Sequence, residues 1–245
     1  MTFDRAGNIY GTAGGGIGCD HTCGVVYELT PSNGGWIETV LHQFTGAGDG
    51  DGPETGVSLD QAGNLYGATC CGGASNYGVV FELKHSKHGW TESTLYSFTG
   101  ASNDRSPNGY LIVDAAGNVY GTTTGGGTGC QYQCGAVFEL SRSHVKTVLY
   151  TFDGVHGASP NAPLVLDNVG SLYGSTLLGG TSNDAVVFKL QHDRTWTIRI
   201  LHSFTGSGDG ANPNAGLILG REGNLYGTTS SVYDSQYGGT VFEIP

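Results

Sequence analysis

The residues of this chain that could do acid–base chemistry lie in loops where an otherwise regular pattern breaks. Asp51 and Glu54 form a compact pair of carboxyl groups, and His21 and His156 lie in other such loops. Two carboxyl groups about 5 to 9 Å apart can cleave a glycosidic bond, and a histidine could act as the base of a lyase. The sequence has no nucleophile elbow and no Ser-His-Asp order. We therefore predict no catalytic residues, and Asp51, Glu54 and His21 if the chain is an enzyme.

The same loops carry side chains suited to binding a sugar. A polar residue follows a proline in four successive repeats, and we expect these residues near the entrance of a central channel: Glu54, Asn108, Asn161 and Asn214. Loop tyrosines offer an apolar ring and a polar hydroxyl, which suits stacking on a sugar, and the candidates are Tyr77, Tyr132, Tyr233 and Tyr237. The structural alternatives are that the polar residues cap a strand and that the tyrosines anchor their own loops.

Six cysteines lie in equivalent loops of the first three repeats. Two Cys-x3-Cys pairs recur two repeats apart, and they are Cys19 with Cys23 and Cys130 with Cys134. Such a pair could close a small disulfide, and an even count of cysteines is typical of an oxidising compartment. Cys70 and Cys71 could form a vicinal disulfide or remain two thiols. Because the matching loops of the last two repeats lack cysteine, the pattern favours loop disulfides over zinc ligands.

One acidic loop bears on metal binding. Asp49-Gly-Asp51-Gly resembles the opening of a calcium loop, with Asp60 where a twelfth-position ligand would lie. The flanking helices and the bidentate glutamate of an EF-hand are lacking, and Asp209-Gly210 repeats the same turn elsewhere. We predict no metal and no cofactor, with calcium as the alternative.

The elements that position all these residues are tandem repeats. A Gly-Asn-aliphatic-Tyr-Gly phrase recurs in five repeats, with Ser171 in place of asparagine in the fourth, and its tyrosine is at Tyr10, Tyr66, Tyr120, Tyr173 and Tyr226. A period of about 53 residues is typical of a propeller or another repeat array. The chain is therefore one small unit repeated.

Each unit is predicted to contain four short strands, called A to D in chain order. Strand A, such as Val57–Asp60, is nearly all aliphatic, so we expect it innermost and buried on both faces. Strand D, such as Thr94–Phe98, alternates like a half-exposed strand and should lie outermost. No segment shows helical periodicity. The prediction is an all-β, five-bladed β-propeller with incomplete first and last blades, in one domain over residues 1–245 with repeats of approximately 1–52, 53–106, 107–159, 160–212 and 213–245.

Carboxylates that recur in register are predicted to be structural. Asp-x-x-Gly turns join strands A and B, at Asp4, Asp60, Asp114 and Asp167, and aspartate can hydrogen-bond the backbone of such a turn. Strand C carries Glu28, Glu82, Glu139 and Glu243, whereas the fourth repeat has Lys189 at that position. A carboxylate that can be exchanged for an ammonium group is not a shared catalytic group.

The charge balance excludes several partners. Only 10 Lys and Arg residues stand against 21 Asp and Glu, for a net charge of -11, which opposes nucleic-acid binding. No apolar run of about 18 residues and no leader peptide occur, so we predict no membrane insertion. The protein is then either cytosolic or has lost a leader, and the cysteines favour an exported protein.

Four linked motifs, namely Gly223–Thr229, Gly239–Glu243, Thr147–Phe152 and Asp209–Leu217, resemble the Gloeobacter/Verrucomicrobia-type (GloVer) tandem repeat over essentially the whole chain. The resemblance implies secreted or surface-anchored bacterial proteins with a propeller-like fold, and it carries no catalytic residue over to this sequence.

Because strands alternate in direction, the B–C and D–A loops should share one side of the ring. Binding residues concentrate on variable loops over a rigid scaffold. We predict a secreted or cell-surface binding module for a glycan or an extracellular protein. The alternatives are a carbohydrate-active hydrolase or lyase, and a structural repeat protein that self-associates through the open strand edge of its last blade.

Overall fold

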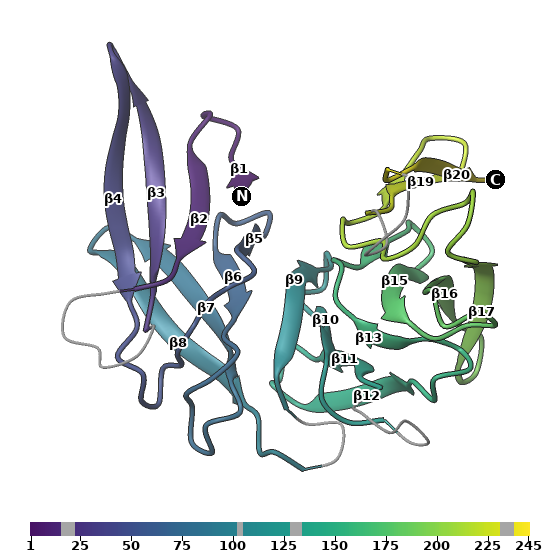
Figure 1. Ribbon diagram of the computed structural model, residues 1–245. Coiled ribbons are helices and arrows are strands. Elements are labelled where there is room, and N and C mark those ends of the chain that lie inside the picture. Colours follow the sequence, from purple (N-terminus) through teal and green to yellow (C-terminus); the bar gives the residue numbers. More distant parts are fainter. Residues whose placement is uncertain (16–22, 102–104, 128–133, 231–237) are drawn as a thin grey trace. The chain divides into compact units, whose positions relative to one another are not determined.

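The computed structural model contains only β-strands and connections in the residues that it describes, which are 1–15, 23–101, 105–127, 134–230 and 238–245 (Figure 1). The predicted all-β class is therefore confirmed. In these ranges there is no long apolar helix of the kind that crosses a membrane.

The described strands form five antiparallel sheets, each built from consecutive strands. The first sheet contains β1 (Thr2–Phe3), β2 (Ile9–Ala13), β3 (Val25–Ser32) and β4 (Gly35–Gln43). The second contains β5 (Val57–Leu59), β6 (Leu65–Ala68), β7 (Val79–Ser86) and β8 (Gly89–Ser97). The third contains β9 (Pro107–Val113), β10 (Val119–Thr123), β11 (Ala136–Leu140) and β12 (Lys146–Thr151).

The last two sheets depart from the four-stranded pattern. In the fourth, β13 (Ala158–Pro160) and β14 (Val165–Leu166) both pair with β15 (Leu172–Leu178), which is followed by β16 (Val186–His192) and β17 (Trp196–Ser203). The fifth has β18 (Ile218–Leu219), β19 (Leu225–Thr228) and β20 (Val241–Ile244). The predicted A-B-C-D order within each sheet is confirmed, and the last described sheet ends at strand C.

The chain divides into two compact units, residues 1–119 with 140–146, and residues 120–139 with 147–245. The division passes through the third sheet and does not follow the predicted repeat limits. A single domain over 1–245 stays a prediction, and the two units are described separately below.

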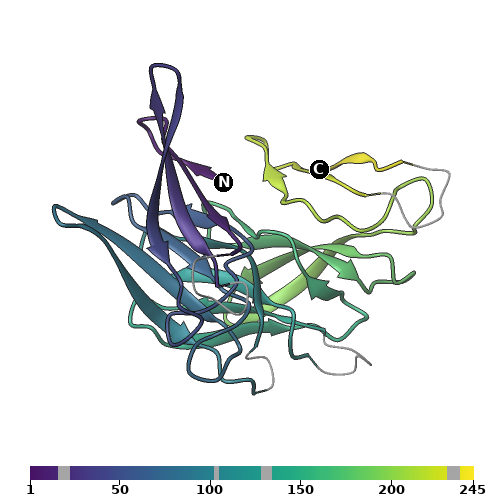
Figure 2. The same cartoon turned by 60° about the vertical axis from the view of Figure 1, so that its left-hand side comes forward.

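In the first unit, the first two sheets pack through one apolar cluster. Tyr10 and Val26 from the first sheet, with Phe44 directly after β4, meet Phe81 and Leu83 from the second. The rings of Phe44 and Phe81 lie edge to face at 5.0 Å. The A strands of successive repeats contact each other, β1 against β5 and β5 against β9. The hairpins β3–β4 and β7–β8 project beyond this core (Figure 2).

The second unit repeats the same aromatic contact between neighbouring sheets. Phe152 and Phe188 lie edge to face at 5.2 Å, and so do Phe204 and Phe242. The sequence placed each such phenylalanine at the end of strand D, but every D strand ends before it. Its N–H instead bonds a carbonyl of the loop before strand C, as Phe204 does to Ala185 at 3.0 Å.

The burial of strand A differs from the prediction. On β5 only Val57 is buried, and Ile218 on β18 is 68% exposed. In the second sheet the inner strands B and C are more buried than strand A, because each has a hydrogen-bonded neighbour on both edges. All four residues of β6 are buried. On β7, Val79, Val80 and Phe81 are fully buried.

The two glycines of the repeated phrase are required for different structural reasons. Gly63 has φ +88°, a conformation that glycine adopts at little cost. Gly67 has an ordinary φ, but a Cβ there would overlap the ring of Phe81. The phrase is therefore a turn followed by a site of close approach between strands B and C.

The aspartates of the A–B turns hold the backbone, as predicted. Asp60 Oδ1 accepts the N–H groups of Ala62 and Asn64 at 2.8 Å each, and Oδ2 accepts the Asn64 amide at 2.9 Å. Asp4, Asp114 and Asp167 make the corresponding backbone contacts. Burial raises the pKa of Asp4, but hydrogen bonds from Asn8 and Ala6 outweigh it, so that pKa lies below its ordinary value.

Candidate functional site

Several of the predicted site residues lie outside the described ranges. These are His21, Tyr132, Tyr233 and Tyr237, together with Cys19 and Cys130. The predictions made for them stay predictions. Their intended disulfide partners Cys23 and Cys134 are buried at 4% and 0% exposure.

A loop cluster in the first unit contains the predicted carboxylate pair. Asp51 and Cys71 exchange two backbone hydrogen bonds, at 2.8 and 3.0 Å, so the D–A loop of the first repeat joins the B–C loop of the second. Asp51 Oδ1 is buried and has no hydrogen-bond partner among the described residues. Glu54 is exposed. We call Asp51, Glu54, Cys70 and Cys71 the loop cluster.

The two cysteines of the loop cluster are thiols in this structure. Their sulfur atoms lie 2.9 Å apart. Burial raises the pKa of the Cys70 thiol to about 12, and the contact with Cys71 and the negative charges of Glu54 and Asp51 add to the effect. The choice between a vicinal disulfide and two thiols stays a prediction.

The predicted polar ring is divided between the two units. Glu54 and Asn108 belong to the first unit, and Asn161 and Asn214 to the second. Their arrangement around one channel therefore stays a prediction. Asn214 is exposed and donates its N–H to the Asn212 carbonyl at 2.9 Å.

Tyr77, the described member of the predicted tyrosine set, lies where a loop anchor would lie. Its side chain is 38% exposed, and its ring covers Gly100 so closely that a Cβ there would overlap it. Its carbonyl accepts the Ser106 N–H at 3.0 Å. The ring thus ties together the B–C and D–A loops of one repeat.

Asp49, the first residue of the calcium-like motif, closes its own turn. It accepts the backbone N–H of Thr45 at 2.9 Å and the Thr45 hydroxyl at 2.5 Å, and it lies 3.4 Å from His42 Nε2. Asp209 contacts Thr205 and His202 in the same way. The two Asp-Gly segments are therefore equivalent loop closures.

His156, the other base considered for a lyase, is held by Asp153. The Asp153 carboxylate lies 2.8 Å from His156 Nδ1 and also accepts the His156 backbone N–H at 2.8 Å. Burial raises the pKa of Asp153, but these bonds to His156 outweigh it, so that pKa lies below its ordinary value. The pair closes a tight, exposed loop.

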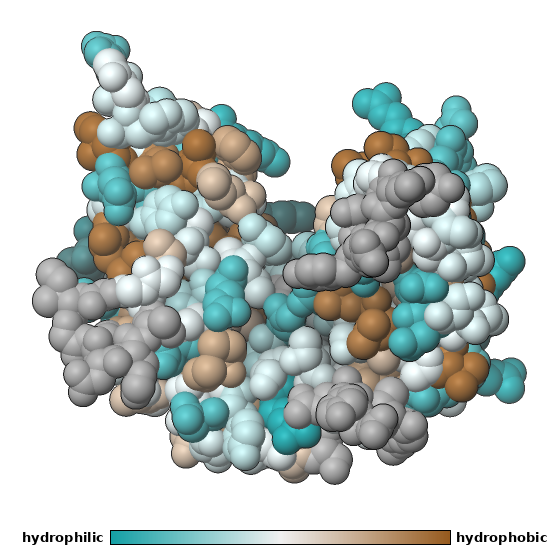
Figure 3. All heavy atoms as spheres, viewed as in Figure 1, coloured by the Kyte–Doolittle hydropathy of each residue, from teal (hydrophilic) through white to brown (hydrophobic). Residues whose placement is uncertain are grey.

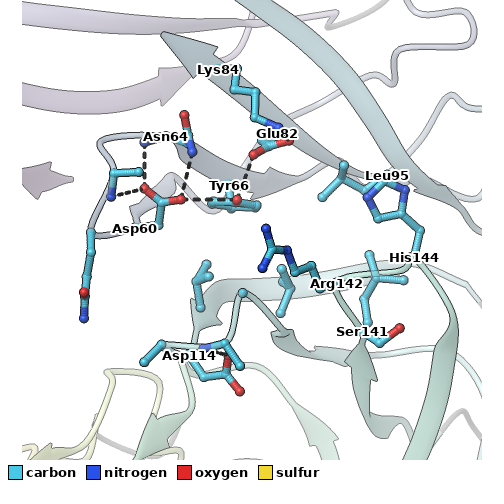
Figure 4. Close-up of a pocket in the computed structure, with 18 residues that line it drawn as sticks. Asp60, Asn64, Tyr66, Glu82, Lys84, Leu95, Asp114, Ser141, Arg142 and His144 are labelled. Atoms are coloured by element: carbon cyan, nitrogen blue, oxygen red, sulfur yellow. Dashed lines mark hydrogen bonds and ion pairs between the residues drawn. The ribbon is translucent and has the colours of Figure 1, made fainter.

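A pocket of about 370 Å³ lies at the A–B turns of the first unit, away from the loop cluster (Figure 4). It is formed by the turn after β5, by β6, β7 and β8, by the turn after β9, and by the connection from β11 to β12. All of its residues belong to the first unit. We call it the turn pocket, and its polar residues include Asp60, Asn64, Tyr66, Glu82, Lys84, Asp114, Ser141, Arg142 and His144.

The buried side of the turn pocket is a hydrogen-bonded network around Tyr66. The Tyr66 hydroxyl lies 2.8 Å from Glu82 Oε1 and 3.3 Å from Asp60 Oδ2. Lys84 Nζ lies 3.1 Å from Glu82 Oε2. Burial raises the pKa of Tyr66, and the hydrogen bond to Glu82 and the negative charges of Glu82 and Asp60 raise it further. The network thus keeps the phenol protonated.

Arg142 enters the turn pocket from the connection between β11 and β12. Its backbone N–H donates to Asn118 Oδ1 at 3.2 Å, and His144, two residues on, has φ +62° and donates its N–H to the Ser141 carbonyl. Figure 4 shows the guanidinium pointing toward Tyr66. No hydrogen bond in the described structure joins this guanidinium to another side chain, so it is available to a ligand.

The turn pocket lies outside the loops on which the sequence analysis placed candidate binding residues, and that placement stays a prediction. Asp60 and Glu82 were predicted to be structural, and the cations beside them break the repeat. The available signal was Ser141–His144, which replaces the long hairpin tip of the first two repeats with a short connection carrying Arg142 and His144.

Residues 1–244 match the Gloeobacter/Verrucomicrobia repeat over nearly the whole chain. The chain belongs to the Gloeobacter/Verrucomicrobia repeat family. No curated protein matches it. Solved structures of similar fold show the fold of this chain. The chain is similar to a gluconolactonase of Xanthomonas campestris, with 18% identity and TM-score 0.54, over 89% of this chain and 64% of that protein.

Two further solved structures are similar to this chain at low sequence identity. A luciferin-regenerating enzyme is 14% identical, with TM-score 0.53 over 90% of this chain and 69% of that one. A protein of unknown function from Dyadobacter fermentans is 12% identical, with TM-score 0.57 over 99% of this chain and 76% of that one. At these identities the likeness shows the fold alone, which is that of the propeller-like gluconolactonases.

Proposed function

We propose that the chain is a saccharide-binding module and that the turn pocket is its binding site. One observation supports this most directly. The guanidinium of Arg142 makes no hydrogen bond to a described side chain, and it lies beside the hydrogen-bonded network of Asp60, Tyr66 and Glu82. Sugar hydroxyls both donate and accept, so they fit a site with fixed carboxylates on one side and a cation on the other. This keeps the predicted glycan ligand but moves it from the variable loops to the turns.

The size and lining of the turn pocket support a small polar ligand. Its volume of about 370 Å³ lies in the range of small-molecule sites, which combine apolar walls with a few placed polar groups. Leu95, Val113, Val119 and Leu140 supply apolar wall, against which the C–H faces of a sugar ring can pack.

The hydrogen bonds favour binding over catalysis at the turn pocket. Both oxygens of Asp60 accept hydrogen bonds from the turn. Tyr66 donates to Glu82 Oε1, and Lys84 donates to Glu82 Oε2. A general acid or base must exchange a proton with its substrate. Carboxylates held by several donors are suited to fixing a ligand.

The test is calorimetric titration of the full chain with a panel of mono- and oligosaccharides that a glycan array has selected. Arg142→Ala is expected to weaken binding about tenfold or more, the loss of one charge-assisted hydrogen bond. Arg199→Ala is the matched control, because Arg199 is an exposed arginine of β17 in the other unit. Unchanged affinity in Arg142→Ala, or the absence of any saccharide ligand, would contradict the proposal.

A second candidate function is hydrolysis at the loop cluster. It is favoured by the buried, unpartnered Oδ1 of Asp51 near the exposed Glu54, and a structure of the same fold is named a gluconolactonase. Release of product from a panel of polysaccharides and sugar lactones, abolished by Glu54→Gln, would support it. Turnover that survives Glu54→Gln would exclude this cluster as the catalytic site.

We further infer that the repeats form a five-bladed propeller of an exported or cell-surface bacterial protein, with disulfides Cys19–Cys23 and Cys130–Cys134. Five sheets of consecutive strands and the propeller-like relatives support the ring, and the burial of Cys23 and Cys134 suits bonded cysteines. Mass spectrometry of the non-reduced, alkylated protein should find two closed Cys-x3-Cys loops. Alkylation of Cys23 and Cys134 without reduction would contradict the pairing.

A further inference from the structure

The two aspartates that line the turn pocket are committed to their own turns. Asp60 accepts three hydrogen bonds from its turn. In the next repeat, Asp114 Oδ1 accepts the N–H groups of Ala116 and Asn118 at 2.9 and 2.8 Å, and Oδ2 accepts the Asn118 amide at 2.9 Å. Neither carboxylate therefore needs a hydrogen-bond donor from a ligand.

The charged side chains of the pocket leave one cation without a partner. Glu82 is paired with Lys84, whose Nζ lies 3.1 Å from Glu82 Oε2. Among the described residues that line the pocket, Arg142 is the one permanently charged side chain that makes no hydrogen bond or ion pair. Its guanidinium points toward Tyr66 (Figure 4). A negatively charged ligand would therefore meet an unpaired cation here.

The backbone and the neighbouring turn hold Arg142 in this position. Its N–H donates to Asn118 Oδ1 at 3.2 Å, and the Ser141 N–H donates to the Val145 carbonyl at 3.0 Å, which closes the connection. A Cβ added at Gly117 would lie 3.6 Å from Arg142 Cδ, so the aliphatic part of the side chain lies along the turn after β9. A side chain that is already positioned loses less freedom when it binds a ligand.

This cation is particular to the third repeat. Arg142 lies four residues after the strand C aromatic residue, and the first, second and fourth repeats have Pro31, His85 and His192 at that place. None of these three side chains is permanently charged. The turn pocket therefore differs from the equivalent turns of those repeats in having a cation that a ligand can reach.

The balance of charges favours a ligand with a single negative charge. Asp60, Glu82 and Asp114 line the pocket against the two cations Lys84 and Arg142. A phosphate monoester carries a charge of about −1.5 to −2 at pH 7, so these carboxylates would repel it more strongly than a carboxylate ligand. The guanidinium also presents parallel N–H donors that match the two oxygens of a carboxylate. A carboxylate is therefore the anion that suits this site.

We propose that the ligand of the turn pocket is an acidic saccharide, and that the carboxylate of a uronate unit pairs with the Arg142 guanidinium. This inference rests on the proposed function, because it names the class of saccharide for the same site. Leu95, Val119 and Leu140 of the pocket wall receive the C–H face of the sugar ring. The charged pair then fixes the orientation of the ring against this wall.

The two projecting hairpins of the first unit provide surfaces for comparison. The β3–β4 hairpin exposes apolar side chains, such as Ile37 at 57% and Val40 at 51%, and Figure 3 shows this apolar surface. At the tip of the β7–β8 hairpin, residues 84–88 are all exposed and include Lys87. Lys87 does not line the turn pocket, so it attracts an acidic saccharide only through non-specific charge. Lys87→Ala is therefore the matched control for Arg142→Ala.

The test compares uronates with their methyl esters in calorimetric titrations of the full chain, using trisaccharides of glucuronate, galacturonate or mannuronate. Esterification removes the charge and leaves the rest of the sugar unchanged. We expect at least one acid to bind about tenfold or more tightly than its ester, the contribution of one charge-assisted pair. This preference should disappear in Arg142→Ala and persist in Lys87→Ala. Arg142→Lys should keep only part of it, because lysine lacks the parallel donors.

Both arginine variants should fold normally, because Arg142 is exposed, and an unchanged urea midpoint checks this. A preference for the acid that survives in Arg142→Ala, or that is lost in Lys87→Ala, would overturn the inference. Tighter binding of a sugar phosphate than of every uronate would also overturn it.

The inference and the proposed function fail in different ways. Equal binding of acids and esters, with slowed hydrogen exchange in residues 60–66 and 140–144, would overturn the inference and leave the turn pocket as a site for neutral saccharides. Absence of binding by any saccharide, acidic or neutral, would overturn both.

Discussion

The second glycine of the repeated phrase offers the sharpest test of how the repeats are packed. In Gly67→Ala the added Cβ overlaps the tip of the Phe81 ring, meeting its Cζ and both Cε atoms. Phe81 is 0% exposed and contacts Phe44 of the neighbouring sheet, so it has no free space to move into. Overpacking at such a site costs about 1–3 kcal/mol of the free energy of unfolding.

The first glycine of the same phrase should respond differently. Gly63 has no atom within reach of an added Cβ but has φ +88°, so Gly63→Ala costs about 1–2 kcal/mol through backbone strain. Phe81→Leu removes the ring atoms that the Cβ added at position 67 would meet. In a Gly67→Ala background it should recover stability, with a coupling free energy of at least about 0.5 kcal/mol.

The assay is urea-induced unfolding followed by tryptophan fluorescence, in a double-mutant cycle of Gly67→Ala with Phe81→Leu. The control cycle combines Gly63→Ala with Phe81→Leu and should be additive. If the two cycles gave the same coupling, or if Gly67→Ala left the urea midpoint unchanged, close approach of strands B and C would not explain the second glycine.

Three further perturbations follow from the network and the titrating groups. Tyr66→Phe should lower the free energy of unfolding by about 1–3 kcal/mol, because it deprives the buried Glu82 of a hydrogen-bond donor. Tyr226→Phe removes the equivalent bond at a tyrosine that is 39% exposed, so it should cost less in the same urea assay. Burial raises the pKa of Asp167, but bonds from Ser171, Val169 and Tyr173 outweigh it. The folded pKa is thus below the ordinary 3.8, and the stability it contributes is present above 3.8 and lost as the pH falls through the folded value. Asp167→Asn should flatten the acid limb of a stability profile measured below about pH 5, and an unchanged limb would contradict this. Because burial raises the pKa of Cys70 to about 12, iodoacetamide at about pH 8 should label Cys70 far more slowly than a free thiol. Mass spectrometry of the labelled peptide measures the rate, and rapid labelling would contradict the prediction.

The sequence predicted those parts of the fold that depend on local chemistry. Residue types at fixed spacing were enough to predict the turn aspartates such as Asp60 and the strand order within each sheet. They also indicated the repeated turn and strand around Tyr66. The burial of strand A could not be predicted in this way, because aliphatic composition is the same whether one face or both faces of a strand are covered. Ile218 and Val57 have similar side chains but very different exposure.

The candidate site was harder to predict because its parts come from different repeats. Glu82 lies in the second repeat and Arg142 in the connection between β11 and β12 of the third, and only the packing of the two repeats brings them to one pocket. Each residue alone is an ordinary surface or strand residue. The sequence analysis proposed the loops because differences between repeats can be read from a sequence. The spatial proximity of residues from different repeats cannot.

The central claim is that the turn pocket, and not the variable loops, receives a saccharide. Hydrogen exchange of the full chain, measured by mass spectrometry with and without a saccharide that binds it, locates the ligand directly. Binding at the turn pocket predicts slowed exchange in residues 60–66, 82–84 and 140–144. Slowed exchange confined to the loops at 45–54 and 69–78 would contradict the claim.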